Sequence, residues 1–113
     1  MTSNVEEFSG TRKELEDIVK LKKATVIVIF NATWCAPCRK FAGELPKIAA
    51  DYPDLSFYTV DIDKNGPLAD TFSVRTMPAF KFLKLNEENE VIVAGEAIGK
   101  DAKIVRKAID KYK

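Results

Sequence analysis

The chain has 113 residues, 46% of them hydrophobic and 31% charged, and its 18 basic and 17 acidic side chains leave a formal net charge of +1. This composition predicts one domain, residues 1–113, that buries its own core without needing a stabilising disulfide. The lysines are spread among acidic residues and no basic run is long enough for a nucleic-acid-binding tail, so no nucleic-acid partner is expected.

The N-terminal sequence argues against export. MTSNVEEFSGTRKELE is polar and acidic, whereas a secretory signal has a basic start followed by an apolar run. The longest apolar stretch, Val26–Phe30, is far shorter than the roughly 20 residues that cross a bilayer. We therefore expect a cytoplasmic protein with no membrane partner. In that compartment cysteines stay reduced unless they are catalytic or bind metal.

The first part of the chain reads as strand, helix, strand. A short strand is expected near residues 5–8. Apolar residues then recur at helical spacing behind Thr11, which is an N-cap candidate with Glu14 three residues on. The β-branched run at residues 24–30 is apolar on both faces, which predicts a central strand with helices on each side of its sheet.

The middle of the chain repeats this alternation. A long helix is expected to begin at Cys35, with a kink at residues 43–46 because Pro46 cannot donate a backbone hydrogen bond. The sequence LSFYTVDID predicts a second central strand over residues 55–63. A short helix should follow over residues 67–72.

The last part predicts a hairpin and a closing helix. The runs at 79–85 and 91–95 are separated by NEENE and read as antiparallel strands, and residues 104–112 form an amphipathic pattern. The order β-α-β-α-β-α-β-β-α predicts an α/β fold with a central mixed sheet and helices on both faces. Such a sheet places Cys35 and Cys38 at the C-terminal end of a central strand, where α/β proteins usually carry their sites.

The only two cysteines lie in the segment FNATWCAPCRKF. Their spacing alone fits a redox pair, half of a metal site or a structural bridge. Their context is more specific. From about residue 5 to the end the chain resembles the thioredoxin family, in three places: Trp34-Cys35-Ala36-Pro37-Cys38 after a hydrophobic strand, Asp61-Ile62-Asp63 at a strand end, and Met77-Pro78 about 40 residues after the motif.

The resemblance implies a thioredoxin fold and a protein-disulfide reductase that uses no cofactor. Cys35 would lie at a helix N-terminus, where unpaired N–H groups and the helix dipole stabilise a thiolate, and Arg39 adds positive charge nearby. Cys35 is therefore expected to be exposed and to attack the substrate disulfide. Cys38, one turn further, should be buried and should resolve the mixed disulfide.

The resemblance also implies a substrate-binding surface. Trp34, Ala36 and Pro37 would surround the thiols. Met77 and Pro78 match a cis-proline loop opposite the cysteines, where the backbone of Met77 would pair with an extended substrate segment. The expected partners are disulfide-containing proteins and thioredoxin reductase as electron donor, and the protein is expected to act as a monomer.

Several positions depart from the family. Ile29 and Thr59 stand where a buried Asp and a Lys partner are typical. Because Ile29 cannot accept a proton, the usual route for deprotonating Cys38 is absent. Other departures are Asn31 at a position that is often Trp or Tyr, Ala42-Gly43 for the common Ala-Pro, and a poor match around Ala97 to the glycine expected before the last helix.

Three other interpretations remain open at this level. A zinc site needs about four ligands, and with two cysteines and no histidine two chains would have to share one ion. A redox-inert interaction module would keep the fold and bind through the surface of Trp34 and Met77. A specialised reductase or isomerase domain would keep the thiol chemistry.

Overall fold

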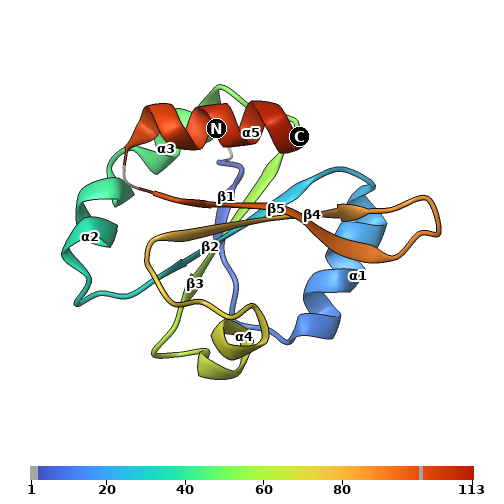
Figure 1. Ribbon diagram of the computed structural model, residues 1–113, viewed down its shortest axis with the longest axis horizontal. Helices are drawn as coiled ribbons and strands as arrows, with labels where there is room; N and C mark the ends of the chain where they lie inside the picture. The colour runs from blue at the N-terminus through green and yellow to red at the C-terminus, as the bar shows by residue number, and fades with distance from the viewer. Residues whose placement is uncertain (1–2, 100) are drawn as a thin grey trace.

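A five-stranded sheet with strand order β1-β3-β2-β4-β5 runs through the middle of the molecule (Figure 1). The computed structural model describes residues 3–99 and 101–113. Neighbouring strands are parallel from β1 through β3 to β2, and antiparallel from β2 through β4 to β5. The strands are β1 (Val5–Glu7), β2 (Val26–Asn31), β3 (Ser56–Asp61), β4 (Ala79–Leu85) and β5 (Val91–Ile98). The predicted mixed sheet is confirmed.

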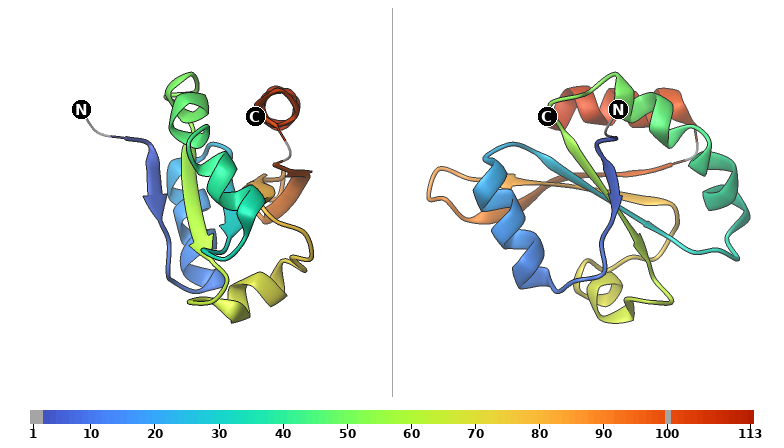
Figure 2. Two further views of the ribbon diagram at one scale, coloured as in Figure 1. Left: turned by 90° about the vertical axis from the view of Figure 1, so that its left-hand side faces the viewer. Right: turned by 180° about the vertical axis from the view of Figure 1, so that it is seen from behind.

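Helices cover both faces of this sheet, as predicted (Figures 1 and 2). One face packs against α1 (Arg12–Lys22) and α4 (Gly66–Thr71). The other face packs against α2 (Ala36–Ala42), α3 (Leu45–Ala50) and α5 (Ala102–Tyr112). None of the helices in the described ranges combines the length and apolar character of a membrane span.

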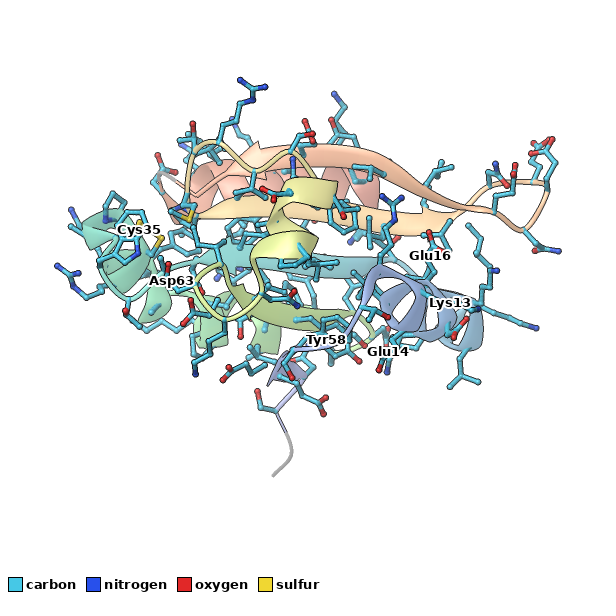
Figure 3. All side chains as sticks on the ribbon, turned by 90° about the horizontal axis from the view of Figure 1, so that it is seen from below. Lys13, Glu14, Glu16, Cys35, Tyr58 and Asp63 are labelled. Atoms are coloured by element: carbon cyan, nitrogen blue, oxygen red, sulfur yellow. A yellow bond between two sulfur atoms is a disulfide. The ribbon has the colours of Figure 1, made fainter. Side chains whose placement is uncertain are left out.

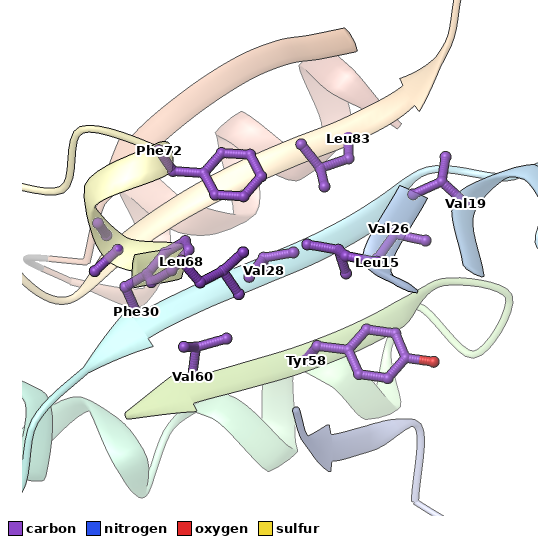
Figure 4. Packing of buried hydrophobic residues seen from close by; sticks show 12 residues of the cluster. Leu15, Val19, Val26, Val28, Phe30, Tyr58, Val60, Leu68, Phe72 and Leu83 are labelled. Atoms are coloured by element: carbon purple, nitrogen blue, oxygen red, sulfur yellow. The ribbon is translucent and has the colours of Figure 1, made fainter. Parts of the chain in front are cut away.

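Strand β2 is central because it is apolar on both faces. Val26, Val28 and Phe30 point into the core beneath α1 and α4 (Figure 4), and Ile27 and Ile29 point into the opposite core. Each is at most 2% exposed. Full burial of such a side chain contributes about 1.5–3 kcal/mol, so this strand fixes the middle of the sheet.

The start of α1 confirms the predicted N-cap. The Thr11 hydroxyl accepts a hydrogen bond from the backbone N–H of Glu14 at 3.2 Å, and the Glu14 carboxylate accepts one from the backbone N–H of Thr11 at 3.2 Å. This reciprocal arrangement satisfies two N–H groups that the first turn leaves without helical partners.

The predicted long helix is instead two helices. Gly43 and Glu44 separate α2 from α3, and Pro46 falls in the first turn of α3. A proline there loses no helical hydrogen bond, because the N–H groups of a first turn have no partner. The proline therefore starts a new helix after the break rather than kinking a continuous one.

The hairpin of β4 and β5 is confirmed, although β5 continues to Ile98, beyond the predicted strand. The register shifts between Phe82 and Leu83, which pair with Gly95 and Val93, so that Ala94 forms a bulge. This strand extension brings the chain back to the end of the sheet where α2 begins.

Candidate active site

The two cysteines lie at the start of α2, just after the end of β2, at one end of the sheet (Figure 3). Cys35 is the N-cap of α2 and Cys38 lies in its first turn. They form a disulfide with Cα atoms 5.2 Å apart, and the backbone N–H of Cys38 donates to Sγ of Cys35 at 3.2 Å. The predicted position of Cys35 at a helix N-terminus is confirmed.

Local sequence explains this turn. The backbone N–H of Cys35 donates to the Ala32 carbonyl at 3.2 Å, which closes a tight turn after β2. Pro37 occupies the first turn of α2, where its fixed φ suits a helix and its missing N–H costs nothing. The carbonyl of Cys35 then accepts a hydrogen bond from the backbone N–H of Arg39 at 3.1 Å, and the helix begins with this bond.

Exposure does not separate the two cysteines. Cys35 is 7% exposed and Cys38 is 5% exposed. The expectation that Cys35 alone would be exposed is wrong for the disulfide form, because both residues pack with Ala32 under Ile62 and Met77. The difference between the cysteines is their place in the helix. Only Cys35 has its sulfur at the N-cap, where the helix field favours negative charge.

The predicted cis peptide bond between Met77 and Pro78 is present. Met77 is half-buried and packs against the cysteine cluster. Pro78 is buried, and its carbonyl accepts the backbone N–H of Gly99 at 2.8 Å. Met77 is therefore the residue of this pair that is accessible beside the disulfide. Pro78 is bound through its carbonyl to Gly99, in the segment after β5.

The poor match to a glycine around Ala97 is followed two residues later by Gly99, and the structure shows why a glycine stands there. A Cβ on Gly99 would lie 2.7 Å from Cγ of Pro78 and 2.9 Å from Cε1 of Phe80. Only a residue without a side chain fits against the proline loop there. The sequence signal was a glycine two positions before Asp101, the N-cap of α5.

Trp34 stands outside the core, with 62% of its surface exposed. Its indole N–H donates to Oδ2 of Asp63 at 2.9 Å, and Figure 3 labels Asp63 and Cys35 at the same end of the molecule. The backbone N–H of Asp63 in turn donates to Oδ1 of Asp61 at 2.9 Å. The strand-end sequence Asp61-Ile62-Asp63 thus anchors Trp34, a role that its residue types did not reveal.

A groove of about 680 Å³ opens beside the first turn of α2. Its lining comes from α2, from the following break and from the segment leading into α5: Ala36, Pro37, Lys40, Phe41, Glu44, Gly99, Asp101 and Ala102. Ala36 and Pro37 of the predicted substrate surface are part of this lining. Trp34 and Met77 are not, so the predicted surface residues are divided between the groove and the surface over the disulfide.

Ile29, which stands where the family typically has a buried Asp, packs in a hydrophobic core cluster. Ile29 is 2% exposed, pairs with Thr59 of β3 and Phe80 of β4, and belongs to the same core cluster as Phe41 of α2. No carboxyl group therefore enters the core from this strand position. Over residues 3–99 and 101–113, no three His, Cys, Asp or Glu side chains gather in a metal-binding group.

The chain matches known proteins along most of its length. The family model described as Thioredoxin matches residues 6–110. Thioredoxin H5 of Oryza sativa subsp. japonica is 38% identical over 81 residues, which is 72% of this chain and 59% of that protein. Thioredoxin of Geodia cydonium is 36% identical over 78 residues, which is 68% of this chain and 74% of that protein.

The fold matches as well. The solved structure of Trichomonas vaginalis thioredoxin superposes with a TM-score of 0.87 at 37% identity, covering 99% of this chain and 100% of that one. The matched region contains the helix-capping cysteine pair and the cis-proline loop described above. The chain therefore belongs to the thioredoxin family of thiol-disulfide oxidoreductases.

Proposed function

We propose that this protein reduces disulfide bonds in other proteins, with Cys35 as nucleophile and Cys38 as resolving thiol. The main support for this proposal is that Sγ of Cys35 lies at the N-cap of α2, where it accepts a hydrogen bond from the backbone N–H of Cys38. In the reduced protein the same N–H and the helix field stabilise a thiolate at Cys35. Thiolates are the attacking species in disulfide exchange.

The reaction runs in two exchanges. The Cys35 thiolate attacks one sulfur of the substrate disulfide, the substrate S–S bond breaks, and the departing thiolate takes a proton. Cys38 then loses its proton and attacks Sγ of Cys35. The mixed disulfide breaks, the second substrate sulfur leaves as a thiol, and the Cys35–Cys38 disulfide forms. Two electrons have passed from the dithiol to the substrate, and the structure holds the oxidised product.

The substrate segment lies beside Met77 in an extended conformation. The Met77 backbone precedes β4, and its side chain already contacts the cysteine cluster. Trp34 is exposed on the same end of the molecule, and Ala36 and Pro37 open onto the groove beside α2. Main-chain pairing gives affinity for many sequences, whereas the groove favours an apolar side chain near the substrate cysteine.

The electron donor is a thioredoxin reductase, which returns the Cys35–Cys38 disulfide to the dithiol. Members of the thioredoxin family take part in this electron transport, and the names of the matched relatives support the same assignment here. The protein works in the cytoplasm as a monomer of one domain. A reducing compartment suits a chain whose only cysteines are the redox pair.

Insulin reduction tests the activity. With NADPH and thioredoxin reductase, catalytic amounts of the protein should precipitate the insulin B chain, and glutathione with glutathione reductase should support a slower reaction. A redox-inert interaction module would leave the insulin soluble in both assays. The Cys35→Ser variant provides the matched inactive control.

The roles of the two thiols are tested separately. Under limiting iodoacetamide the reduced protein should be labelled at Cys35 before Cys38, since the helix N-terminus stabilises only the first thiolate. Cys38→Ser should trap mixed disulfides with substrates, and Cys35→Ser should trap none. Preferential labelling of Cys38 would reverse the two roles.

A further inference from the structure

Arg39 makes a contact that the thiol chemistry does not use. This residue lies in α2, one turn after Cys35, and its side chain folds back toward the start of the helix. There Nη1 donates a hydrogen bond to the carbonyl oxygen of Thr33 at 2.9 Å. The backbone N–H of Arg39 donates to the carbonyl of Cys35 at 3.1 Å. One residue thus holds both ends of the segment 33–35.

This segment needs such a contact because little else covers it. Thr33 and Trp34 are exposed, and the segment lies between the end of β2 and the start of α2. Its backbone is fixed by the turn from Cys35 to Ala32. The carbonyl of Thr33 and the N–H of Trp34 belong to one planar peptide unit. A hydrogen bond to this carbonyl therefore fixes the backbone at Trp34 and the direction of its side chain.

A second contact holds the same residue from the other side. The indole of Trp34 is bound to Asp63, in the loop between β3 and α4. The main chain of Trp34 is thus fixed to α2 through Arg39, and its ring is fixed to the end of β3. Neither contact alone determines both the backbone and the ring.

We propose that Arg39 is a positioning residue, which fastens the Thr33 carbonyl to α2 and so holds Trp34 in place beside the reactive sulfur. The inference rests on the proposed reductase function, because the held position matters where a substrate docks. The guanidinium is suited to this contact, since its planar set of donors directs a hydrogen bond along a fixed line. A lysine would supply the charge without that direction.

The charge of Arg39 is a separate effect. A cation near the start of α2 also favours the Cys35 thiolate, although the exposed position of Arg39 weakens this by solvent and salt screening. Arg39→Lys keeps the charge and removes the directed contact, and Arg39→Ala removes both. Lys107→Ala removes one positive charge from an exposed position of α5 and serves as the control.

Time-resolved fluorescence anisotropy measures the position directly, because Trp34 is the only tryptophan of the chain. Loss of one hydrogen bond with a net worth of about 1 kcal/mol corresponds to roughly a fivefold rise in the ratio of released to held segment. The fast local depolarisation of Trp34 should therefore increase in both Arg39→Lys and Arg39→Ala. It should match the parent protein in Lys107→Ala.

Two further measurements separate position from charge. The kcat/KM for insulin reduction should fall about threefold to fivefold in Arg39→Lys, while the pH midpoint of Cys35 alkylation stays at the parent value. Near-ultraviolet circular dichroism and a thermal melt verify that the variants are folded.

The proposal is overturned if Arg39→Ala depolarises like the parent, or if Arg39→Lys keeps the parent anisotropy and kcat/KM while Arg39→Ala loses them. It is equally overturned if the alkylation midpoint of Arg39→Lys departs from the parent value, because the charge is kept in that variant. Failure of the reductase function has a different signature. The parent protein would then reduce no insulin, whereas the anisotropy comparison would still decide the role of Arg39.

Discussion

Ile29 packs in the core cluster that also contains Phe41, a residue of the helix that carries both cysteines. Its neighbour across the sheet, Thr59, offers no cation. A carboxyl placed at this position would be buried without a charged partner, which disfavours its ionised form and costs stability. The same carboxyl would place a proton acceptor on the strand that leads to the cysteine pair, where the proposed mechanism needs one.

We predict that Ile29→Asp is less stable than the parent by about 2–4 kcal/mol, from the lost apolar packing and the buried polar group. Release of the mixed disulfide should nevertheless become faster near neutral pH, because Cys38 gains an internal base. Thermal melts measure the first effect, and stopped-flow fluorescence of Trp34 measures the second.

Ile29→Asn is the matched control, since it has nearly the same shape as the Asp variant and no titratable proton. It should lose similar stability without any gain in rate. If Ile29→Asp is less stable and no faster, then Cys38 already has another proton acceptor and this account of Ile29 is wrong.

At the scale of single residues, the sequence predicted which side chains gather but not every contact between them. Cys35 and Cys38 were identified by their residue type and spacing, and Met77 by the resemblance of Met77-Pro78 to the cis-proline loop of the thioredoxin family. Asp63 and Arg39 were assigned no contact. Their hydrogen bonds depend on where two loops come together in space, and that geometry is set by packing between strands far apart in the chain.

The segment between β5 and α5 shows how an element is fitted to its neighbour. Gly99 lies against Pro78 and Phe80, and its φ lies outside the left-handed region. Its requirement is therefore space and not backbone freedom. We predict that Gly99→Ala destabilises the fold by about 1–3 kcal/mol, as overpacking does at tight contacts, and slows insulin reduction by displacing the Met77–Pro78 loop. Urea unfolding and the insulin assay measure the two effects.

Gly43→Ala is the contrasting substitution. Gly43 has helical backbone angles (φ −72°, ψ −23°), and a Cβ there would meet nothing within 4 Å. The change should be neutral or stabilising by up to about 1 kcal/mol, because alanine restricts the unfolded chain. Equal effects of the two substitutions would contradict the steric argument for Gly99.

Strands β4 and β5 share an ion pair with unequal burial. Lys81 is 7% exposed, and its Nζ lies 2.5 Å from Oε1 of Glu96, whose side chain is 61% exposed. Removing Glu96 leaves a buried ammonium without its partner, whereas removing Lys81 leaves a carboxylate that water can solvate.

We therefore predict that Glu96→Gln lowers the free energy of unfolding by about 1–2 kcal/mol, a value reduced by the solvent around Glu96. Lys81→Met should be neutral or stabilising, because a methionine fills the same apolar space without a charge. Urea unfolding at pH 7 compares the two variants. A larger loss in Lys81→Met than in Glu96→Gln would show that the pair itself stabilises the sheet.

At the scale of elements, period and turn residues predicted the number and order of strands, but the helix break was read as a kink. The apolar positions of α2 and α3 keep one helical phase through Gly43 and Glu44. Periodicity therefore could not distinguish one bent helix from two. The break follows from the backbone demands of Pro46 on the turn before it, which are conformational and leave no mark on the hydrophobic pattern.

The stability of the whole molecule depends on pH in part through Tyr58, a residue of the inner strand β3. The side chain of Tyr58 is buried, and its strand β3 pairs with β1 on one side and β2 on the other. Burial, together with the charge of Glu6, raises the pKa of Tyr58 above the usual 10.0. The folded state thus keeps the tyrosine protonated at pH values where the unfolded chain ionises. This contribution to stability is complete below pH 10 and is lost as the pH rises through the folded-state pKa.

Tyr58→Phe should therefore flatten the alkaline decline in stability above pH 10. The urea midpoint of the parent, measured from pH 8 to about pH 11, should fall relative to that of the variant as the pH rises. If the difference between them stays constant over this range, Tyr58 does not contribute through ionisation.

The fold of the whole molecule was predicted more completely than its parts. Apolar strands such as β2 can be buried only when helices cover both faces, and the alternation of strands and helices supplies those helices. The packing role of Gly99 was not predicted, because the short connection between β5 and α5 has no periodicity from which contacts can be inferred. Contacts across such connections emerge only when the sheet is assembled.

The bulge at Ala94 leaves the outer edge of β5 uneven. This edge runs from Val91 to Ile98 with Glu96 as its one charged residue, a pattern that invites pairing with strands of other chains. The bulge interrupts the row of outward N–H and C=O groups and increases the local twist, so an incoming strand meets only short runs of donors and acceptors. The bulge therefore makes this edge a poor template for the strands of other protein chains, and the sheet stays closed on this side.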